Sequence, residues 1–353
     1  MARHLTALRH PGLEAHVTRR LAMIYDEGPS DAEDRPPHVR AASGLSAFKE
    51  YLAVIQDDAN WLALIDADDR IRAWPLPPGP SGARVFSSER GNKHEKFDLE
   101  ACITVPGKDG HELIGFASGS HLGREWILRV CENTSFGAAL TEAPLHAQAR
   151  TELEAEFLDA TRFYEALRAN KAFSGAGLNI EGAVAVDDDR IVLLQRGNAP
   201  AKDGLEPVDA TAEVPWRALA AHLADPEDVP APILDNVTQY DLGTLDGVRL
   251  TFSDAEYLGE GRILYSASAE DPETDRIAGS VLGVIDLDGS VHWTELTNQD
   301  GGYFRGKIEG LSRDARDRRK VHFVIDDDDE TVPSEIFEAA LSEGFFRPRA
   351  HRL

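Results

Sequence analysis

The stretch NIEGAVAVDDDRIVLLQRGN, residues 179–198, decides the fold class that the sequence predicts. A short apolar run carries one glutamate, Glu181, near its start, and an acidic turn, 187–189, follows it. A second apolar run, 191–194, then ends in polar residues. Two strands joined by a tight turn fit this pattern, and the turn aspartates are expected to be solvated. A glutamate buried among apolar residues is costly unless it is paired or bound to a metal, so Glu181 is a candidate functional residue.

The same arrangement occurs four more times along the chain. Each copy has a polar residue in a short strand, then a turn, and then an apolar strand that ends in polar residues. We call the polar residues of the first strands the anchors; they are Ser43, Glu100, Glu181, Ser253 and Glu309. Repeats of this kind correspond to repeated structural units, and they outweigh other sequence signals.

Many short strands with polar turns and few helices indicate an all-β, closed architecture. Five anchored repeats predict a five-bladed β-propeller, with six blades as the alternative. Residues 1–37 are expected to form an N-terminal extension and linker, with a short helix within 1–25, and residues 38–353 a single propeller domain. Apolar residues at helical spacing predict one inserted helix from Arg150 to Lys171. Short helical segments are also expected at 215–223 and 333–342.

Composition excludes two classes of partner. The 353 residues are 42% apolar and 28% charged, as in an ordinary globular protein, and their net charge is −25. Such a charge argues against nucleic acid and against an anionic membrane surface. No apolar run approaches the roughly 20 residues of a membrane span, and the N-terminus lacks the pattern of a signal peptide, so the cytoplasm is the expected location. The sequence makes no prediction of the oligomeric state.

In a propeller the first strand of every blade lines a central channel, so the five anchors are expected to converge on one axis. Three carboxylates there repel one another unless a cation lies among them. Serine and glutamate supply oxygen ligands, which suit Ca²⁺. We therefore expect one Ca²⁺ contacted by Ser43, Glu100, Glu181, Ser253 and Glu309. The alternative is that these residues are hydrogen-bonded structural positions around a water-filled channel.

The anchor series Ser, Glu, Glu, Ser, Glu resembles that of the calcium-activated nucleotidases, or apyrases. The likeness extends to Asp57-Asp58 after the first anchor, to the lysine that precedes Glu100, and to Arg196, which stands where the family has an arginine pair. It covers about five short islands between Ser43 and Asp327. The resemblance implies a five-bladed propeller with one axial calcium and activity on nucleotides.

Two further resemblances concern shorter segments. The stretches 38–40, 56–60 and 90–93 are similar to those of an uncharacterised bacterial propeller family. The Ile-Glu-Gly segments, at 180–182 and 308–310, more loosely resemble those of esterase-like phytase propellers.

Polar residues at the ends of the second strands, with basic residues from nearby loops, are expected at one mouth of the channel. This combination suits hydrolysis of a phosphate ester, in which cations hold the phosphate and a carboxylate activates water. The catalytic candidates are Asp57, Asp58 and Glu270, with Asp57 or Asp58 as the expected general base. The candidate residues for binding a phosphorylated small molecule are Arg40, Arg90, Lys93, Lys96, Gln195, Arg196, Asn198, Asp326 and Asp327.

The sequence thus leaves three functions open. The first is a calcium-dependent phosphohydrolase that acts on nucleotides or another phosphate ester. The second is a non-catalytic propeller pinned by calcium that binds a ligand or a protein. The third is an esterase or lactonase of the calcium-propeller kind.

Overall fold

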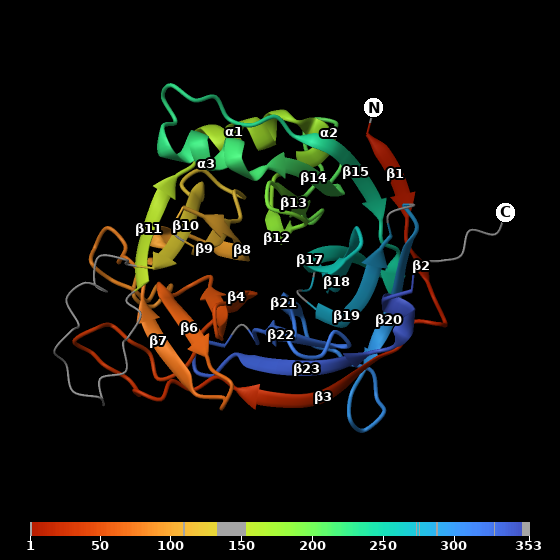
Figure 1. The fold of residues 1–353 in the computed structure, drawn as a ribbon, viewed down its shortest axis with the longest axis horizontal. Coiled ribbons are helices and arrows are strands. Elements are labelled where there is room, and N and C mark those ends of the chain that lie inside the picture. Colours follow the sequence, from red (N-terminus) through yellow and green to blue (C-terminus); the bar gives the residue numbers. More distant parts are fainter. Residues whose placement is uncertain are drawn as a thin grey trace.

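The computed structural model describes residues 2–108, 110–132, 153–272, 274, 276–286, 289–327 and 329–347. Within these residues, strands pair into five antiparallel units of four strands, which surround a common centre (Figure 1). In each unit the first strand lies nearest the centre and the fourth lies at the rim (Figure 1). The predicted all-β propeller is therefore confirmed as the fold class.

The strands follow the chain from the inside of each unit to its outside. Unit 1 contains β4 (Ala42–Phe48), β5 (Tyr51–Gln56), β6 (Trp61–Ile65) and β7 (Ile71–Pro75). Unit 2 contains β8 (Leu99–Gly107), β9 (Gly110–Ala117), β10 (Trp126–Glu132) and β11 (Leu153–Asp159). Unit 3 contains β12 (Ile180–Ala185), β13 (Arg190–Gln195), β14 (Asp209–Pro215) and β15 (Asp235–Asp241).

Unit 4 contains β17 (Val248–Gly259), β18 (Arg262–Asp271), β19 (Arg276–Ile285) and β20 (Val291–Thr297). Unit 5 contains β21 (Ile308–Arg313), β22 (Lys320–Ile325), β23 (Glu335–Leu341) and, from the other end of the chain, β3 (Ala15–Ala22). Three short strands complete the sheets: β1 (Arg3–Thr6), β2 (Leu8–Arg9) and β16 (Thr244–Leu245).

The N-terminal segment is built into the sheets. Strand β3 pairs antiparallel with β23, and β1 and β2 pair in parallel with β15 and β20. The prediction of a short helix in 1–25 is therefore wrong. Ala15 and Val17 are buried while His16 is exposed, which is the two-residue alternation of a strand. Pairing with β23 prevails over the weak helical spacing of the local sequence.

The inner strands form a closed ring of contacts, from β4 to β8, β12, β17, β21 and back to β4. Small residues beside the anchors allow this close approach. A Cβ atom on Gly310 would lie 2.7 Å from the Leu45 nitrogen, and one on Gly182 would lie 3.1 Å from the Asp254 Cα. In the described residues the inner strands of the five units thus form one closed ring.

Gly310→Ala is expected to destabilise the protein by about 1–3 kcal/mol, because the added methyl group meets backbone atoms that cannot move aside. The measurement is the free energy of unfolding in denaturant. Gly302→Ala is the matched control, since its nearest neighbour is the flexible carboxylate of Asp300 at 3.2 Å. Equal stability of the two variants would contradict the close contact between β21 and β4.

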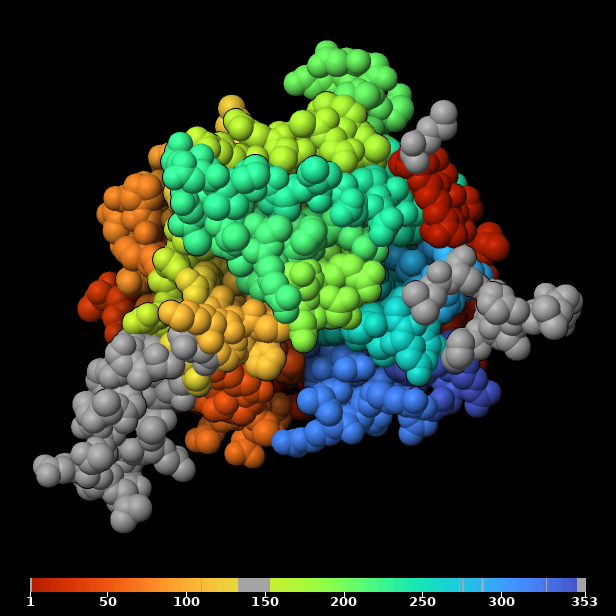
Figure 2. All heavy atoms as spheres, turned by 45° about the horizontal axis from the view of Figure 1, so that its top comes forward, coloured from red at the N-terminus to blue at the C-terminus, as the bar shows by residue number. Residues whose placement is uncertain are grey.

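Helices are few and lie together along one edge of the ring. They are α1 (Thr161–Ala169), α2 (Lys171–Ser174) and α3 (Trp216–Ala224), with single turns of 3-10 helix at Lys93–Glu95 and Glu343–Phe345. Figure 1 shows α1, α2 and α3 over the outer edge of unit 3, and Figure 2 brings this edge forward. Phe163, Tyr164 and Leu219 of these helices join the apolar core between units 2 and 3. None of the helices in the described residues is long and apolar enough to cross a membrane.

Two predicted helices are partly or wholly strands. The helix expected from Arg150 to Lys171 begins at Thr161, because 153–159 form the outer strand of unit 2, paired with β10; residues 150–152 lie outside the described residues. The segment 333–342 contains strand β23, which lies between β22 and β3. In both places the segment pairs with the edge of a neighbouring strand. The periodicity of the local sequence does not show that such an edge is available. Helix α3 agrees with the prediction for 215–223.

Candidate functional site

All five anchors occupy the same kind of position in the fold. Each lies on the innermost strand of its unit at a β-bulge, where the ladder with the second strand skips one residue. In unit 3, for example, Ile180 pairs with Gln195 and Gly182 pairs with Leu194, so Glu181 is the residue skipped. Bulges re-aim side chains and are common beside active sites. The sequence repeat therefore corresponds to a structural repeat that places one polar residue per unit near the centre.

The second strands of units 1 and 3 end close to the anchors of the same units. The backbone N–H of Asp57 donates to the Ala41 carbonyl, and that of Arg196 donates to the Asn179 carbonyl, both at 2.9 Å. Ala41 and Asn179 each lie two residues before an anchor. In units 1 and 3 the polar ends of the second strands and the anchors therefore lie at the same end of the ring of inner strands, which we call the mouth.

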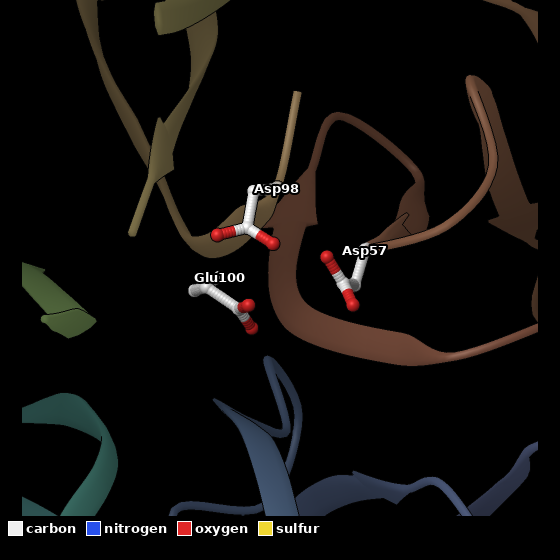
Figure 3. Close-up of side chains that lie close together, drawn as sticks. All are labelled: Asp57, Asp98 and Glu100. Atoms are coloured by element: carbon white, nitrogen blue, oxygen red, sulfur yellow. The ribbon is translucent and has the colours of Figure 1, made fainter. Parts of the chain in front are cut away.

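Three carboxylates from units 1 and 2 form a cluster at this mouth. The side chains of Asp57, Asp98 and Glu100 point toward one another (Figure 3), with ligand oxygens that all lie within 4.8 Å of one another. Lys96 Nζ donates to the two carboxylate oxygens of Asp57 at 2.7 and 2.6 Å and lies 2.7 Å from Asp98 Oδ1. Arg124 Nη1 donates to Asp98 Oδ2 at 2.9 Å. We call Asp57, Asp98 and Glu100 the acidic cluster; its donor set could hold a metal ion.

The backbone of Asp98 contributes to this geometry. Its φ of 63° lies in the left-handed region, which costs on the order of 1–3 kcal/mol and is concentrated at functional sites. Asp tolerates this region better than most residues. The observed conformation places a carboxylate that is only 2% exposed between Lys96 and Arg124.

Burial and mutual repulsion shift the pKa values in the acidic cluster. Burial, together with the neighbouring Asp98 carboxylate, raises the pKa of Asp57 to about 7. Burial, followed by the charges of Asp57 and Glu181, raises the pKa of Glu100 well above its ordinary value. Burial acts against ionisation of Asp98 too, but Lys96 holds the pKa of Asp98 below its ordinary value. The raised pKa values of Asp57 and Glu100 indicate that Lys96 and Arg124 do not fully offset burial and repulsion in the cluster.

A second cluster joins units 3, 4 and 5 on the other side of the mouth. Arg196, only 4% exposed, donates from Nη1 to Glu181 at 3.1 Å and from Nη2 to Glu270 at 2.7 Å. Lys307 Nζ lies 2.8 Å from Glu309 and 3.5 Å from Glu270. We call Glu181, Arg196, Glu270, Lys307 and Glu309 the arginine cluster.

The carboxylates of the arginine cluster differ in their pKa values. Burial raises the pKa of Glu309 to about 7 even though Lys307 lies beside it. Burial acts in the same direction on Glu270, but Lys307 and Arg196 hold its pKa below the ordinary value. Glu309 is therefore the one of these two that can exchange a proton near neutral pH.

Among the described residues, the mouth contains more carboxyl groups than basic side chains. Its carboxylates are Asp57, Asp98, Glu100, Glu181, Glu270 and Glu309, and the cations paired with them are Lys96, Arg124, Arg196 and Lys307. Six acids facing four cations leave room for additional positive charge. Oxygen donors of this kind fit a hard cation such as Ca²⁺.

The two serine anchors are engaged in hydrogen bonds of the sheets. Ser43 Oγ donates to the Leu99 carbonyl at 2.6 Å, and Ser253 Oγ donates to Ser266 Oγ at 2.9 Å. The predicted contact of these serines with calcium stays a prediction. Of the five residues predicted to contact calcium, Glu100 belongs to the acidic cluster, while Glu181 and Glu309 belong to the arginine cluster.

Several residues predicted for catalysis or substrate binding have other partners. Arg40 pairs with Asp58 at 2.7 Å and with Glu330 at 3.1 Å, and Arg90 pairs with Asp34 at 2.7 Å. These ion pairs are formed by partners outside the two clusters. Lys93 is exposed in its single helical turn.

Of the remaining predicted residues, three form hydrogen bonds with neighbouring segments and one is exposed. Gln195 donates from Nε2 to the carbonyl of Gly177 at 2.9 Å and is fully buried. Asn198 Oδ1 accepts a hydrogen bond from the Asn179 side chain at 3.2 Å. Asp326 accepts one from Ser334 at 3.0 Å, and Asp327 is exposed.

Asp98 and Lys307 were not among the predicted site residues. Both lie two residues before an anchor and directly before the inner strands β8 and β21. This shared position relative to Glu100 and Glu309 is a signal that the sequence contains. Arg124 has no comparable signal, because it comes from the loop between β9 and β10.

Comparison with solved structures gives matches of low similarity. A streptogramin B lyase is 11% identical, with 92% of this chain and 98% of that chain covered and a TM-score of 0.38. A glutaminyl cyclase from Myxococcus xanthus is 11% identical, with 97% and 99% covered and a TM-score of 0.41. A gluconolactonase from Xanthomonas campestris is 12% identical, with 83% and 69% covered and a TM-score of 0.33. At these scores the likenesses carry no argument about this chain.

No curated protein matches the sequence. The calcium-activated nucleotidases, which the anchor series resembles, are not among these matches. A family model described as "Family of unknown function (DUF6929)" matches residues 38–341, which include all five anchors and both clusters. Because this match spans most of the sequence, the chain belongs to the DUF6929 family.

Proposed function

We propose that the mouth of the channel binds Ca²⁺ through Asp57, Asp98 and Glu100 and hydrolyses a phosphate ester of a small molecule. The observation that carries this proposal is the excess of carboxylates over cations at one mouth of a closed ring of strands. Three buried or half-buried carboxylates in one cluster are costly without more positive charge than Lys96 and Arg124 supply. Carboxylate oxygens are the ligands that Ca²⁺ prefers.

The proposed chemistry divides between the two clusters. A bound Ca²⁺ would supply charge that offsets the negative oxygens of a phosphate. Glu309 is proposed as the general base, because its pKa of about 7 matches the pH at which it would accept a proton from water. Arg196 and Lys307 form ion pairs with Glu181 and Glu270 beside it and give this side of the mouth the cations that an anionic substrate needs.

Calcium binding is tested by thermal and chemical unfolding. Saturation to a hundredfold over Kd should stabilise the folded protein by about 2.7 kcal/mol, and a chelator should remove this gain. Asp57→Asn should weaken binding by roughly tenfold to a thousandfold, since a unit charge about 4 Å from an ion is worth about 1–4 kcal/mol. Calorimetric titration with CaCl₂ measures the affinity directly. Asp187→Asn is the matched control, because this aspartate lies in an exposed turn.

If neither the unfolding curve nor the titration responds to CaCl₂ or to a chelator, the cation site is not where we propose it. A loss of affinity in Asp187→Asn equal to that in Asp57→Asn would also contradict the assignment, because it would indicate a general effect of charge.

The reaction is tested by release of phosphate from nucleotides, sugar phosphates and an aryl phosphate, each with CaCl₂ and with chelator. Release that requires calcium supports the proposal. Aryl esters and lactones form a second panel, and turnover confined to that panel would replace the phosphohydrolase by an esterase or lactonase.

One observation favours a non-catalytic propeller as the second candidate. The cations Lys96, Arg196 and Lys307 are all paired with carboxylates, so they would have to exchange partners to hold a phosphate. Calcium binding without turnover of either panel would select this candidate, with the mouth as a binding surface for a ligand or a protein.

A further inference from the structure

Lys96 occupies the place in the acidic cluster that a cation would take. Its Nζ lies within 2.7 Å of both Asp57 oxygens and of Asp98 Oδ1, and its side chain is only 7% exposed. A lysine contacts three carboxylate oxygens here, and a divalent cation at this position would need the same lone pairs.

We infer that Lys96 competes with the divalent cation for the same carboxylates. Its ammonium group must leave Asp57 and Asp98 before the cation can bind there. The inference rests on the proposed cation site at Asp57, Asp98 and Glu100. It makes Lys96 the residue that sets the affinity of the site, so that the metal enters only at concentrations that displace the ammonium group.

The local structure allows the side chain to move while the backbone stays in place. The Phe97 ring stacks on Phe157 with centroids 3.7 Å apart and also packs edge-on against Trp126 at 5.3 Å. These contacts fix the residue that follows Lys96. A lysine has four rotatable bonds in its stem, so its ammonium group can turn toward the mouth without a change in the backbone. There it would be free to contact an anionic group of a substrate.

Lys307 provides the comparison within the same mouth. Its Nζ contacts Glu309 and Glu270, which belong to the arginine cluster. Removal of Lys307 changes the net charge of the mouth by the same amount as removal of Lys96. The two lysines differ in which carboxylates they release, so a direct competitor can be distinguished from a general electrostatic effect.

The first test is calorimetric titration of the wild type, Lys96→Met and Lys307→Met with CaCl₂ at one ionic strength. Lys96→Met is expected to bind Ca²⁺ at least about tenfold more tightly than the wild type, because the competing cation is gone. Lys307→Met is expected to stay within about threefold of the wild type. Equal changes in the two variants, or no gain in Lys96→Met, would overturn the inference.

A second test uses the unaltered protein and does not depend on the variants folding. Lysines are acetylated briefly with acetic anhydride, with and without CaCl₂, and the modified residues are identified by mass spectrometry. Ca²⁺ should increase the labelling of Lys96, which leaves its carboxylates, and leave exposed Lys93 unchanged. Equal or lower labelling of Lys96 at saturating Ca²⁺ would overturn the inference.

The two tests separate this inference from the proposed function. If calcium binds tightly and its affinity is the same in the wild type and in Lys96→Met, the cation site is retained and only the competition by Lys96 is refuted. If neither the wild type nor Lys96→Met binds calcium, both the competition by Lys96 and the proposed cation site are refuted.

Discussion

Glu309→Gln is expected to lower turnover of the phosphate ester by about 10²–10⁴-fold at saturating Ca²⁺, which is the range for loss of a general base. Glu309 lies at a bulge on the innermost strand β21, and burial raises its pKa to about 7. A glutamine of nearly the same shape cannot accept the proton. The measurement is kcat at several calcium concentrations.

Two comparisons make this result specific. The wild-type rate should fall as the pH drops through about 7, because the carboxyl must be deprotonated to accept a proton, and the variant should lack this step. Asp57→Asn should behave differently, since excess CaCl₂ should restore much of its activity. If excess CaCl₂ restores Glu309→Gln instead, Glu309 is a calcium ligand, as the sequence alone predicted, and it is not the base.

Arg196→Ala is expected to destabilise the protein by about 3–5 kcal/mol, the cost of removing one partner from a buried ion pair. Arg196 also donates from Nε to Thr251 at 3.1 Å, so its loss removes one buried donor each from Glu181, Glu270 and Thr251. These residues come from units 3 and 4, so the guanidinium group joins neighbouring blades. The measurement is the free energy of unfolding in denaturant.

Arg190→Ala is the control for this prediction. Arg190 is 50% exposed and pairs with Asp187 in the turn of the same hairpin, so its removal should cost less than about 1 kcal/mol. A loss in Arg196→Ala as small as that in Arg190→Ala would show that the arginine cluster contributes little to stability. Its role would then be confined to ligand binding.

The sequence by itself determined the repeat and the type of structure. Residues 179–198 are the hairpin of β12 and β13, and every anchor lies at the bulge of an inner strand. These features are local, because a two-residue alternation, a turn and a polar residue at a fixed place lie within about 20 residues of one another. The same locality explains why the solvated turn at 187–189 could be predicted.

Only the tertiary structure decided which segments complete the sheets and which charged residues meet. Strand β3 completes unit 5 by pairing with β23, which lies more than 300 residues further along the chain. Segments β11 and β23 are strands because they pair with the edges of β10 and β22. In the same way, Lys96 contacts Asp57 of another unit, and Arg196 contacts Glu270 of the next one. The sequence predicted most of these side chains as site residues, but it did not predict which of them pair with each other. Ring closure fixes the distances between strands that are far apart in the chain, and no local pattern encodes those distances.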